Sequence, residues 1–291
     1  MTPIERARVA LEGLSVADAF GEQLLHAGPE ARLIALDTKT APRRKRWMWT
    51  DDTAMALSIV EVLEAGGGID PERLAHAFVK RYAIEPARGD GRGAHEVLAA
   101  IATGTPYDVA AKALFAGQGS CGNGGGMRSA PIGAYFADDL DAVVAHAIRS
   151  AAPTHAHPDG AAGAVAIAVA AARVVAGERD PRALLETVVA RTPPGATRDG
   201  IRRSIAMLGA EPITVAAELG NGSRVLAADT IPFAIWCAAT HLGDYAGALW
   251  DCASVGGDID TTCAMAGGII VGAVGLDGIP AEWRASREPL P

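Results

Sequence analysis

Helical signals recur along the entire sequence, whereas no run of residues shows the alternating pattern of a half-buried strand. Two segments, Asp70-Pro71 and Thr105-Pro106, place proline directly after a capping residue, which is the signature of a helix start. Breaks such as Gly66-Gly67-Gly68 separate the helical segments, and none is long enough to be an interdomain linker. The sequence therefore predicts an all-α fold of about a dozen helices in a single compact domain, residues 1–291.

The expected helices have apolar residues at helical spacing, and they cover residues 3–25, 50–64, 71–82, 109–115, 139–151, 159–175, 181–190, 197–208, 212–219, 230–240, 244–254 and 258–274. In the first of them, Gly13, Ala17 and Gly21 put small side chains on one face, which permits close packing of another helix. The most apolar stretch, 160–172, is too short and too rich in small residues for a membrane span, so we expect a buried core helix.

Two short acidic segments lie far apart in the sequence, and each directly precedes an expected helix. They read Trp49-Thr50-Asp51-Asp52-Thr53 and Gly256-Gly257-Asp258-Ile259-Asp260-Thr261-Thr262. Carboxylates this crowded repel one another unless a positive charge lies between them. Oxygen ligands without His or Cys favour Mg²⁺, Mn²⁺ or Ca²⁺. From a loop-to-helix junction, neighbouring Asp and Thr side chains can face one ion, so the two segments together can hold two ions.

Helix capping is the alternative interpretation of these segments. Asp and Thr are good N-cap residues, and acidic groups are stabilised at the positive end of the helix dipole. One Asp at each helix start would need no further explanation. Two carboxylates and a hydroxyl at each of two helix starts exceed that need, so metal binding is the favoured interpretation.

A glycine-rich segment, 117–128, and a pair of histidines are further candidate sites. The segment has six glycines within residues 117–126, and such segments expose backbone N–H groups that can bind phosphate oxygens. It matches neither a Walker loop nor GxGxxG, so a flexible turn is the alternative. His155 and His157 precede the most apolar helix. They can bind a sugar, a phosphate or a metal, and helix capping by Asp159 is the alternative there.

Composition excludes several classes of partner and compartment. The net charge of −8 argues against general affinity for nucleic acid. The basic run Arg43-Arg44-Lys45-Arg46 is either a solvated loop or a patch that steers a phosphate towards the first acidic segment. The four cysteines show no zinc spacing and no secretory signal precedes the first helix, which predicts a cytoplasmic protein without membrane partners.

Taken together, these motifs resemble those of the ADP-ribosylglycohydrolase family, in the family's order and spacing. The resemblance covers residues 13–275, and its motifs are Asp18-Ala19-Phe20-Gly21, Trp49–Thr53, Gly122–Pro131, Thr154-His155, Ile231–Trp236 and Gly256–Thr261. It implies an all-α fold with a binuclear Mg²⁺ or Mn²⁺ centre that cleaves the bond between the distal ribose of ADP-ribose and an acceptor group. The implied partner is an ADP-ribosylated substrate whose acceptor the sequence does not identify.

The resemblance also implies roles for individual residues. One ion would be bound by Thr50, Asp51 and Asp52, and the other by Asp258, Asp260 and Thr261, with Asp260 bridging the two. Asp52 and Asp258 would thereby act in catalysis. Glu22 is the nearest match to an acidic residue that the family places near the second ion, although its offset from Gly21 is shorter than in some members.

The same resemblance implies a substrate site along the glycine-rich segment. Its residues would be Phe115 against adenine, His155 near the distal ribose, and Gly119, Ser120, Cys121, Gly122, Asn123 and Gly124 around the diphosphate. Cys121 stands where some members have an aromatic residue, and Asp90 replaces an aromatic of related loops.

The expected function is metal-dependent removal of ADP-ribose from a modified acceptor. The two alternatives are a protein that binds ADP-ribose without turnover and a metal-dependent nucleotide phosphoesterase.

Overall fold

A computed structural model describes residues 1–42 and 46–291. Over these residues the chain forms seventeen α-helices and one 3₁₀ helix, so the all-α prediction is confirmed. Residues 43–45, which carry most of the predicted basic run, lie outside the described residues. The helices are α1 (Pro3–Leu25), α2 (Pro29–Thr38), α3 (Asp51–Gly66), α4 (Pro71–Ile84), α5 (Arg92–Ala102), α6 (Tyr107–Gly117), α7 (Gly124–Met127), α8 (Ala130–Tyr135), α9 (Leu140–Ala151), α10 (Pro158–Val175), α11 (Pro181–Arg191), α12 (Ala196–Ile205), α13 (Pro212–Leu219), α14 (Ala227–Thr240), α15 (Tyr245–Ser254), α16 (Ile259–Val274), η1 (Leu276–Gly278) and α17 (Ala281–Ser286).

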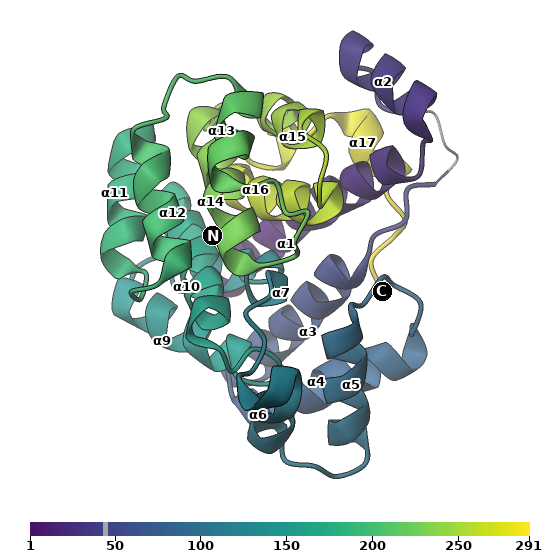
Figure 1. Ribbon diagram of the computed structural model, residues 1–291, viewed down its shortest axis with the longest axis vertical. Coiled ribbons are helices and arrows are strands. Elements are labelled where there is room, and N and C mark those ends of the chain that lie inside the picture. The colour runs from purple at the N-terminus through teal and green to yellow at the C-terminus, as the bar shows by residue number, and fades with distance from the viewer. Residues whose placement is uncertain (43–45) are drawn as a thin grey trace.

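Helices α1 and α16 pack against each other over most of their length, in the middle of the molecule (Figure 1). The small residues of α1 make this possible, as the sequence predicts. A Cβ atom added at Gly21 would lie 2.5 Å from Cα of Asp260, and one added at Gly267 would lie 2.4 Å from Cβ of Ala17. This close approach brings the middle of α1 next to the start of α16, where the second acidic segment lies.

Helix α10 lies in the core. Its length and hydropathy would suffice to cross a membrane, but 72% of it is buried inside the protein. The alanines and glycines of α10 allow its neighbours to pack closely, and these neighbours include α7, α8, α9 and α16. The expectation of a buried core helix is therefore confirmed.

Several helix starts follow the capping residues that the sequence shows. Asp70 accepts a hydrogen bond from the backbone N–H of Arg73 at the start of α4, and Asp139 caps α9 in the same way. The prediction from Thr105-Pro106 is wrong in detail, because Pro106 is itself the N-cap of α6 and no side chain caps that helix. Five of the α-helices in the described residues were not predicted from the sequence, namely α2, α5, α7, α8 and α17, and two of these have eight or more residues. One is α2, at the edge of the molecule in Figure 1, and the other is α5, which has no side-chain cap.

The glycine-rich segment is more ordered than predicted, because residues 124–127 form the short helix α7 and are not loop. A Cβ atom at Gly126 would lie 2.4 Å from Cδ1 of Ile231, and one at Gly125 would lie 2.9 Å from the carbonyl oxygen of Gly160. The backbone contact at Gly125 leaves no room for a side chain unless the backbone shifts, whereas at Gly126 the Ile231 side chain would have to move. Tertiary packing thus outweighs the low helix propensity of glycine, and the interpretation as a flexible turn is wrong for these four residues.

Candidate metal centre

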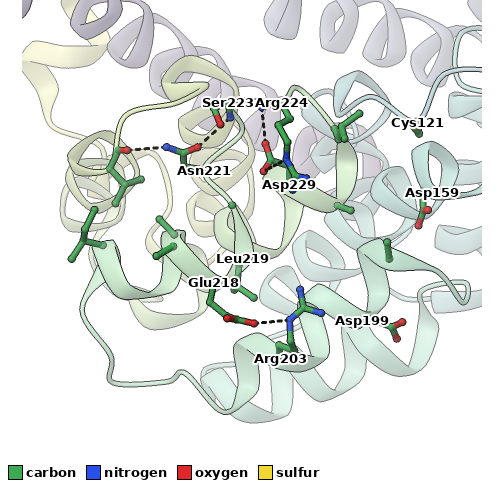
Figure 2. Close-up of a pocket in the computed structure, with 18 of the residues that line it drawn as sticks. Cys121, Asp159, Asp199, Arg203, Glu218, Leu219, Asn221, Ser223, Arg224 and Asp229 are labelled. Carbon is green, nitrogen blue, oxygen red and sulfur yellow. Dashed lines mark hydrogen bonds and ion pairs between the residues drawn. The ribbon is translucent and has the colours of Figure 1, made fainter. Parts of the chain in front are cut away.

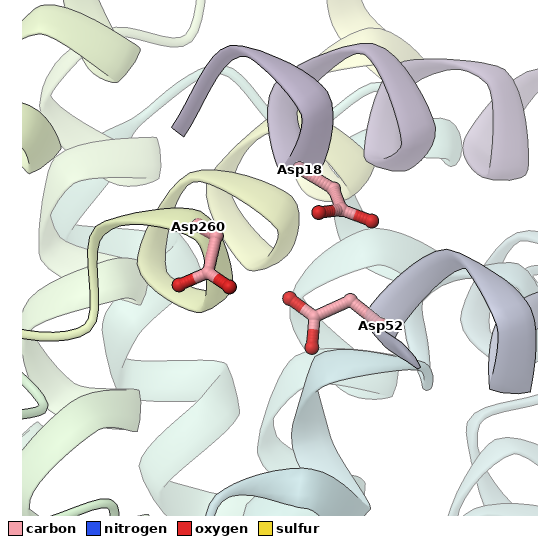
Figure 3. A group of neighbouring side chains, drawn as sticks. All are labelled: Asp18, Asp52 and Asp260. Carbon is pink, nitrogen blue, oxygen red and sulfur yellow. The ribbon is translucent and has the colours of Figure 1, made fainter. Parts of the chain in front are cut away.

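Three helices bring carboxylates together at one point. Asp18 comes from the middle of α1, Asp52 from the first turn of α3, and Asp260 from the first turn of α16. Each offers one oxygen, and the three oxygens lie within 4.8 Å of one another (Figure 3). The hydroxyl of Thr261 also donates to Oδ1 of Asp52 at 3.4 Å. The two acidic segments therefore meet in the fold.

Asp18 belongs to this group, although the sequence analysis assigned it no role at the metal site. Its side chain is fully buried and accepts four hydrogen bonds from the start of α3. The donors are the backbone N–H groups of Thr50 and Thr53, at 2.9 and 3.2 Å, and their hydroxyls, at 2.9 and 2.5 Å. Asp18 thus holds the first acidic segment against α1. The signal that could have found it is a single acid within the apolar run Val16-Ala17-Asp18-Ala19-Phe20.

Burial and mutual repulsion work against the charged form of these acids. Burial, followed by the charges of neighbouring carboxylates, holds the pKa values of Asp51, Asp52 and Asp260 well above the ordinary range. Burial also raises the pKa of Asp258, and it raises the pKa of Asp18 to about 6. Among the described residues, no Lys or Arg forms an ion pair with any of the five. A cation would relieve this repulsion.

Two buried carboxylate oxygens have no hydrogen-bond partner among the residues that the structure describes. They are Oδ2 of Asp52 and Oδ1 of Asp260. A buried charged oxygen without a partner is costly unless a ligand satisfies it. The surrounding donor set is entirely oxygen, which suits a hard divalent cation such as Mg²⁺ or Mn²⁺. The residues present therefore fit the metal that the sequence predicts.

Capping does not account for the second acidic segment. Asp258 stands at the N-cap position of α16, but its side chain makes no capping hydrogen bond. Instead, its Oδ2 accepts a hydrogen bond from Nδ2 of Asn123 at 2.6 Å. At α3 the cap is Thr50, whose hydroxyl accepts from the backbone N–H of Asp52 at 3.3 Å. Side-chain capping therefore accounts for none of the four aspartates, although Asp51, Asp52 and Asp260 stand in first helical turns, where the helix dipole favours a negative charge.

The glycine-rich segment adjoins the acidic group through Asn123. Besides its bond to Asp258, Nδ2 of Asn123 donates to the hydroxyl of Thr230 at 3.1 Å. Ser120 belongs to the same segment, and its hydroxyl accepts a hydrogen bond from the backbone N–H of Gly122 at 3.1 Å. Gly119 approaches the 155–158 turn so closely that an added Cβ atom would lie 2.8 Å from the backbone N of His157. The predicted phosphate segment and the predicted metal segments therefore form one continuous region.

His155 packs directly on this segment. A Cβ atom at Gly124 would lie 3.0 Å from Cε1 of the His155 ring, and one at Gly122 would lie 3.5 Å from its Nε2. Its Nδ1 is 2.7 Å from the hydroxyl oxygen of Thr154. Burial and the nearby charge of Arg128 hold the pKa of His155 well below its ordinary value. At neutral pH His155 is therefore an uncharged ring that can form hydrogen bonds.

Phe115 is exposed, with 62% of its surface open to solvent. It and Ala116 both have left-handed backbone conformations, with φ of 52° and 57°. Such conformations are unfavourable for residues with side chains and are retained where the surrounding structure or a function requires them. Phe115 therefore lies on the surface and not in the core, which leaves its predicted role against adenine untested.

Glu22 and Asp90 lie outside the three-carboxylate cluster. Glu22 is one turn after Asp18 on α1 and pairs with Nε2 of His26 at 2.9 Å. The charge of Asp90, the residue that replaces an aromatic, helps to raise the pKa of Asp51 after the larger effect of burial. The structure thus places Asp90 near Asp51, whereas the printed contact of Glu22 is with His26 and its predicted catalytic role stays a prediction.

A large cavity adjoins the glycine-rich segment but does not include the acidic group. Its volume is about 890 Å³, and α12, α13 and the start of α14 form most of its wall (Figure 2). Cys121 and His157 line it, but none of the three clustered carboxylates does. Ion pairs such as Arg203–Glu218, at 3.2 Å, and Arg224–Asp229, at 2.9 Å, satisfy most of the charge in its wall. The cavity therefore does not contain the candidate metal centre.

Comparison with known proteins gives a consistent result. The family model described as ADP-ribosylglycohydrolase matches residues 1–289. The human protein named ADP-ribosylhydrolase ARH3 is 30% identical over 286 residues, covering 86% of this chain and 77% of its own length. ADP-ribosylarginine hydrolase Tri1 of Pseudomonas putida is 24% identical, covering 96% and 73% respectively.

A solved structure agrees with these sequence relatives. It is described as an ADP-ribosylglycohydrolase-related protein complex and superposes with a TM-score of 0.70 at 25% identity, covering 98% of this chain and 93% of its own. The helical architecture, the joined acidic segments and these matches lead to one conclusion. The chain belongs to the ADP-ribosylglycohydrolase family.

Proposed function

We propose that this protein hydrolyses the glycosidic bond between ADP-ribose and a modified acceptor, using two divalent cations, Mg²⁺ or Mn²⁺. Membership in the family supports the reaction class, since the chain matches the ADP-ribosylglycohydrolase model over nearly its whole length. One observation carries the metal dependence. Buried carboxylates from three distant segments converge, and two of their oxygens have no partner among the described residues.

The proposed ligands divide into two sets that share Asp260. Thr50, Asp51 and Asp52 would hold one ion, while Asp258, Asp260 and Thr261 would hold the other. Asp18 would support the first set, because its carboxylate fixes the backbone and hydroxyl of Thr50. It also lies close enough to Asp52 and Asp260 to share an ion with them.

Glycoside cleavage passes through an oxocarbenium-like state and needs a positioned water and an oriented sugar. Divalent ions, when bound, lower the pKa of a coordinated water and orient hydroxyl groups. In the proposal, Asp52 and Asp258 fix the geometry of the reacting centre, and Asn123 holds Asp258 in place by its 2.6 Å hydrogen bond. Glu22, one turn beyond Asp18, is the candidate for moving a proton at the scissile bond.

The rest of the ligand would lie along the glycine-rich segment. Backbone groups of residues 119–124 would face the diphosphate, with Phe115 against the adenine and His155 near the distal ribose. Cys121 offers no aromatic face, so Phe115 would be the stacking partner for the adenine. The thiol groups of all four cysteines are free, which supports a reducing, cytoplasmic compartment as part of the proposal.

The test is a set of defined conjugates in which ADP-ribose is linked to Arg, to Ser or to a nucleic acid end, each incubated with the protein and Mg²⁺. Release of intact ADP-ribose, abolished by a chelator and by Asp260→Asn, is the expected outcome. Release of AMP or inorganic phosphate would instead identify a phosphoesterase. Binding of ADP-ribose without release from any conjugate would identify a non-catalytic binder, and either result would refute the proposal.

A further inference from the structure

Arg128 is a buried cation with an unusual set of contacts. Its side chain is completely buried, and among the described residues no carboxylate forms an ion pair with it. Two of its nitrogens donate hydrogen bonds, and the guanidinium carbon lies 4.5 Å from the centre of the Phe78 ring. The acceptors are Sδ of Met55 at 2.9 Å, the carbonyl oxygen of Ser150 at 2.9 Å and the hydroxyl oxygen of Thr154 at 2.8 Å. A buried charge held this way invites a functional explanation.

The Thr154 hydroxyl connects Arg128 to His155. Its oxygen lies 2.8 Å from Nη2 of Arg128 and 2.7 Å from Nδ1 of His155. A guanidinium group can only donate, so the hydroxyl oxygen accepts from Arg128. The hydroxyl proton then has one acceptor within reach among the described residues, namely Nδ1 of His155.

The alternative arrangement would leave a buried donor unsatisfied. If Nδ1 of His155 carried a proton, it would donate to Thr154, and the Thr154 hydroxyl proton would lack an acceptor in the described part of the chain. Thr154 is only 3% exposed, so water does not readily replace that acceptor. An unsatisfied buried donor costs about 1–3 kcal/mol. The favoured form of the ring is therefore the one in which Nδ1 accepts and Nε2 carries the proton.

Nε2 faces the glycine-rich segment. Cβ atoms added at Gly122 and Gly124 would lie 3.5 and 3.3 Å from it, so side chains at either position would crowd this nitrogen. None of the described residues forms a hydrogen bond with Nε2. Burial, followed by the positive charge of Arg128, lowers the pKa of His155, so the imidazole stays neutral beside a region suited to phosphate and sugar oxygens.

We infer that Arg128 and Thr154 are positioning residues that fix His155 as a neutral Nε2–H donor to an oxygen of bound ADP-ribose. In this role His155 orients the ligand and neither takes nor gives a proton during hydrolysis. The inference depends on the proposed function for the identity of the ligand. The location of the imidazole proton, in contrast, is a property of the free protein.

The proton can be located by ¹⁵N nuclear magnetic resonance of protein labelled at histidine. In the wild type without ligand, Nδ1 of His155 is expected to resonate as a non-protonated nitrogen and Nε2 as a protonated one. Thr154→Val keeps the branched shape but lacks the hydroxyl, so His155 should populate both neutral tautomers. Thr154→Ser keeps the hydroxyl and should retain the wild-type pattern. Thr192→Val removes another buried threonine hydroxyl, one that bonds the carbonyl of Val188, and it controls for a general loss of packing. A protonated Nδ1 in the wild type would overturn the inference.

The donor role is tested by calorimetric titration with ADP-ribose. Thr154→Val should weaken binding by about tenfold, the equivalent of one hydrogen bond. His155→Gln, which keeps an N–H group, should bind more tightly than His155→Leu. Equal affinity of the wild type, Thr154→Val and His155→Leu would overturn the donor role. If the wild type itself binds no ADP-ribose, the donor role fails together with the proposed function. The resonance pattern of the free protein still tests the position of the imidazole proton, because that measurement needs no ligand.

Discussion

Asp52→Asn is expected to stabilise the metal-free protein near neutral pH and to remove its stabilisation by Mg²⁺. Asp52 is buried, and its Oδ2 has no hydrogen-bond partner among the described residues. The charges of Asp18, Asp260 and other acids around it disfavour its ionised form, after the larger effect of burial. An amide of the same shape removes one of these repelling charges and supplies a donor to its neighbours.

The magnitude follows from the pKa values. The pKa of Asp18 rises from 3.8 to about 6 on folding, and at about 1.4 kcal/mol per unit this corresponds to about 3 kcal/mol. Because the folded carboxyl holds its proton more tightly than the unfolded one, the free energy of unfolding falls as pH rises through this window, and the loss is complete above it. The pKa values of Asp51, Asp52, Asp258 and Asp260 shift in the same direction. Removal of one charge should recover about 1–2 kcal/mol of that loss.

The assay is urea unfolding of wild type and Asp52→Asn at about pH 5 and about pH 8, with chelator or with Mg²⁺. Mg²⁺ at a hundredfold excess over its dissociation constant should stabilise the wild type by about 2.7 kcal/mol and should leave the variant unchanged. Asp37→Asn, on the exposed surface of α2, controls for the change in net charge. The reasoning is refuted if the metal-free variant is less stable than the wild type at the higher pH, or if it keeps the Mg²⁺ effect.

Three further predictions follow from particular contacts. Asp260→Asn should slow release of ADP-ribose by about a hundredfold or more, measured by chromatography, because electrostatic groups at a reacting centre commonly contribute that much; a rate near that of the wild type would contradict its role. Gly21→Ala should lower the free energy of unfolding by about 1–3 kcal/mol and weaken Mg²⁺ binding, since the added Cβ atom would lie 2.5 Å from Cα of Asp260; calorimetry that shows unchanged Mg²⁺ affinity would argue against this. Phe115→Ala should weaken ADP-ribose binding by about tenfold and leave ribose 5-phosphate binding unchanged, because the exposed ring is proposed to contact adenine; an equal loss for both ligands would contradict that assignment.

Local signals predicted much of the fold. The helix start with an acidic cap and proline at Asp70-Pro71 appears at the expected position because the Asp70 side chain satisfies a backbone N–H group through local geometry. The start of α2 also carries a proline, Pro29 after Gly28, and that signal could have revealed it. Helix α7 could not be predicted in this way, because its glycines are held in a helix by distant neighbours.

At the site, the clustering of carboxylates in the sequence indicated the metal chemistry, since adjacent acids are informative without any knowledge of the fold. Asp18 carried no such signal, because it is a single acid on an apolar helix and only the packing of α1 against α3 and α16 reveals its partners. In the sequence, Arg128 was noted only as a member of the motif Gly122–Pro131. Its contact with Thr154 joins residues that are distant along the chain, and sequence periodicity does not report such contacts.

The central claim is that the segments carrying Asp18, Asp52 and Asp260 jointly hold two divalent cations. Crystals grown or soaked with Mn²⁺ test it most directly, through anomalous diffraction measured at the manganese absorption edge. We expect two peaks between α1 and the starts of α3 and α16, both lost in Asp260→Asn crystals. The absence of any peak among these carboxylates, in crystals that take up Mn²⁺ elsewhere, would contradict the claim.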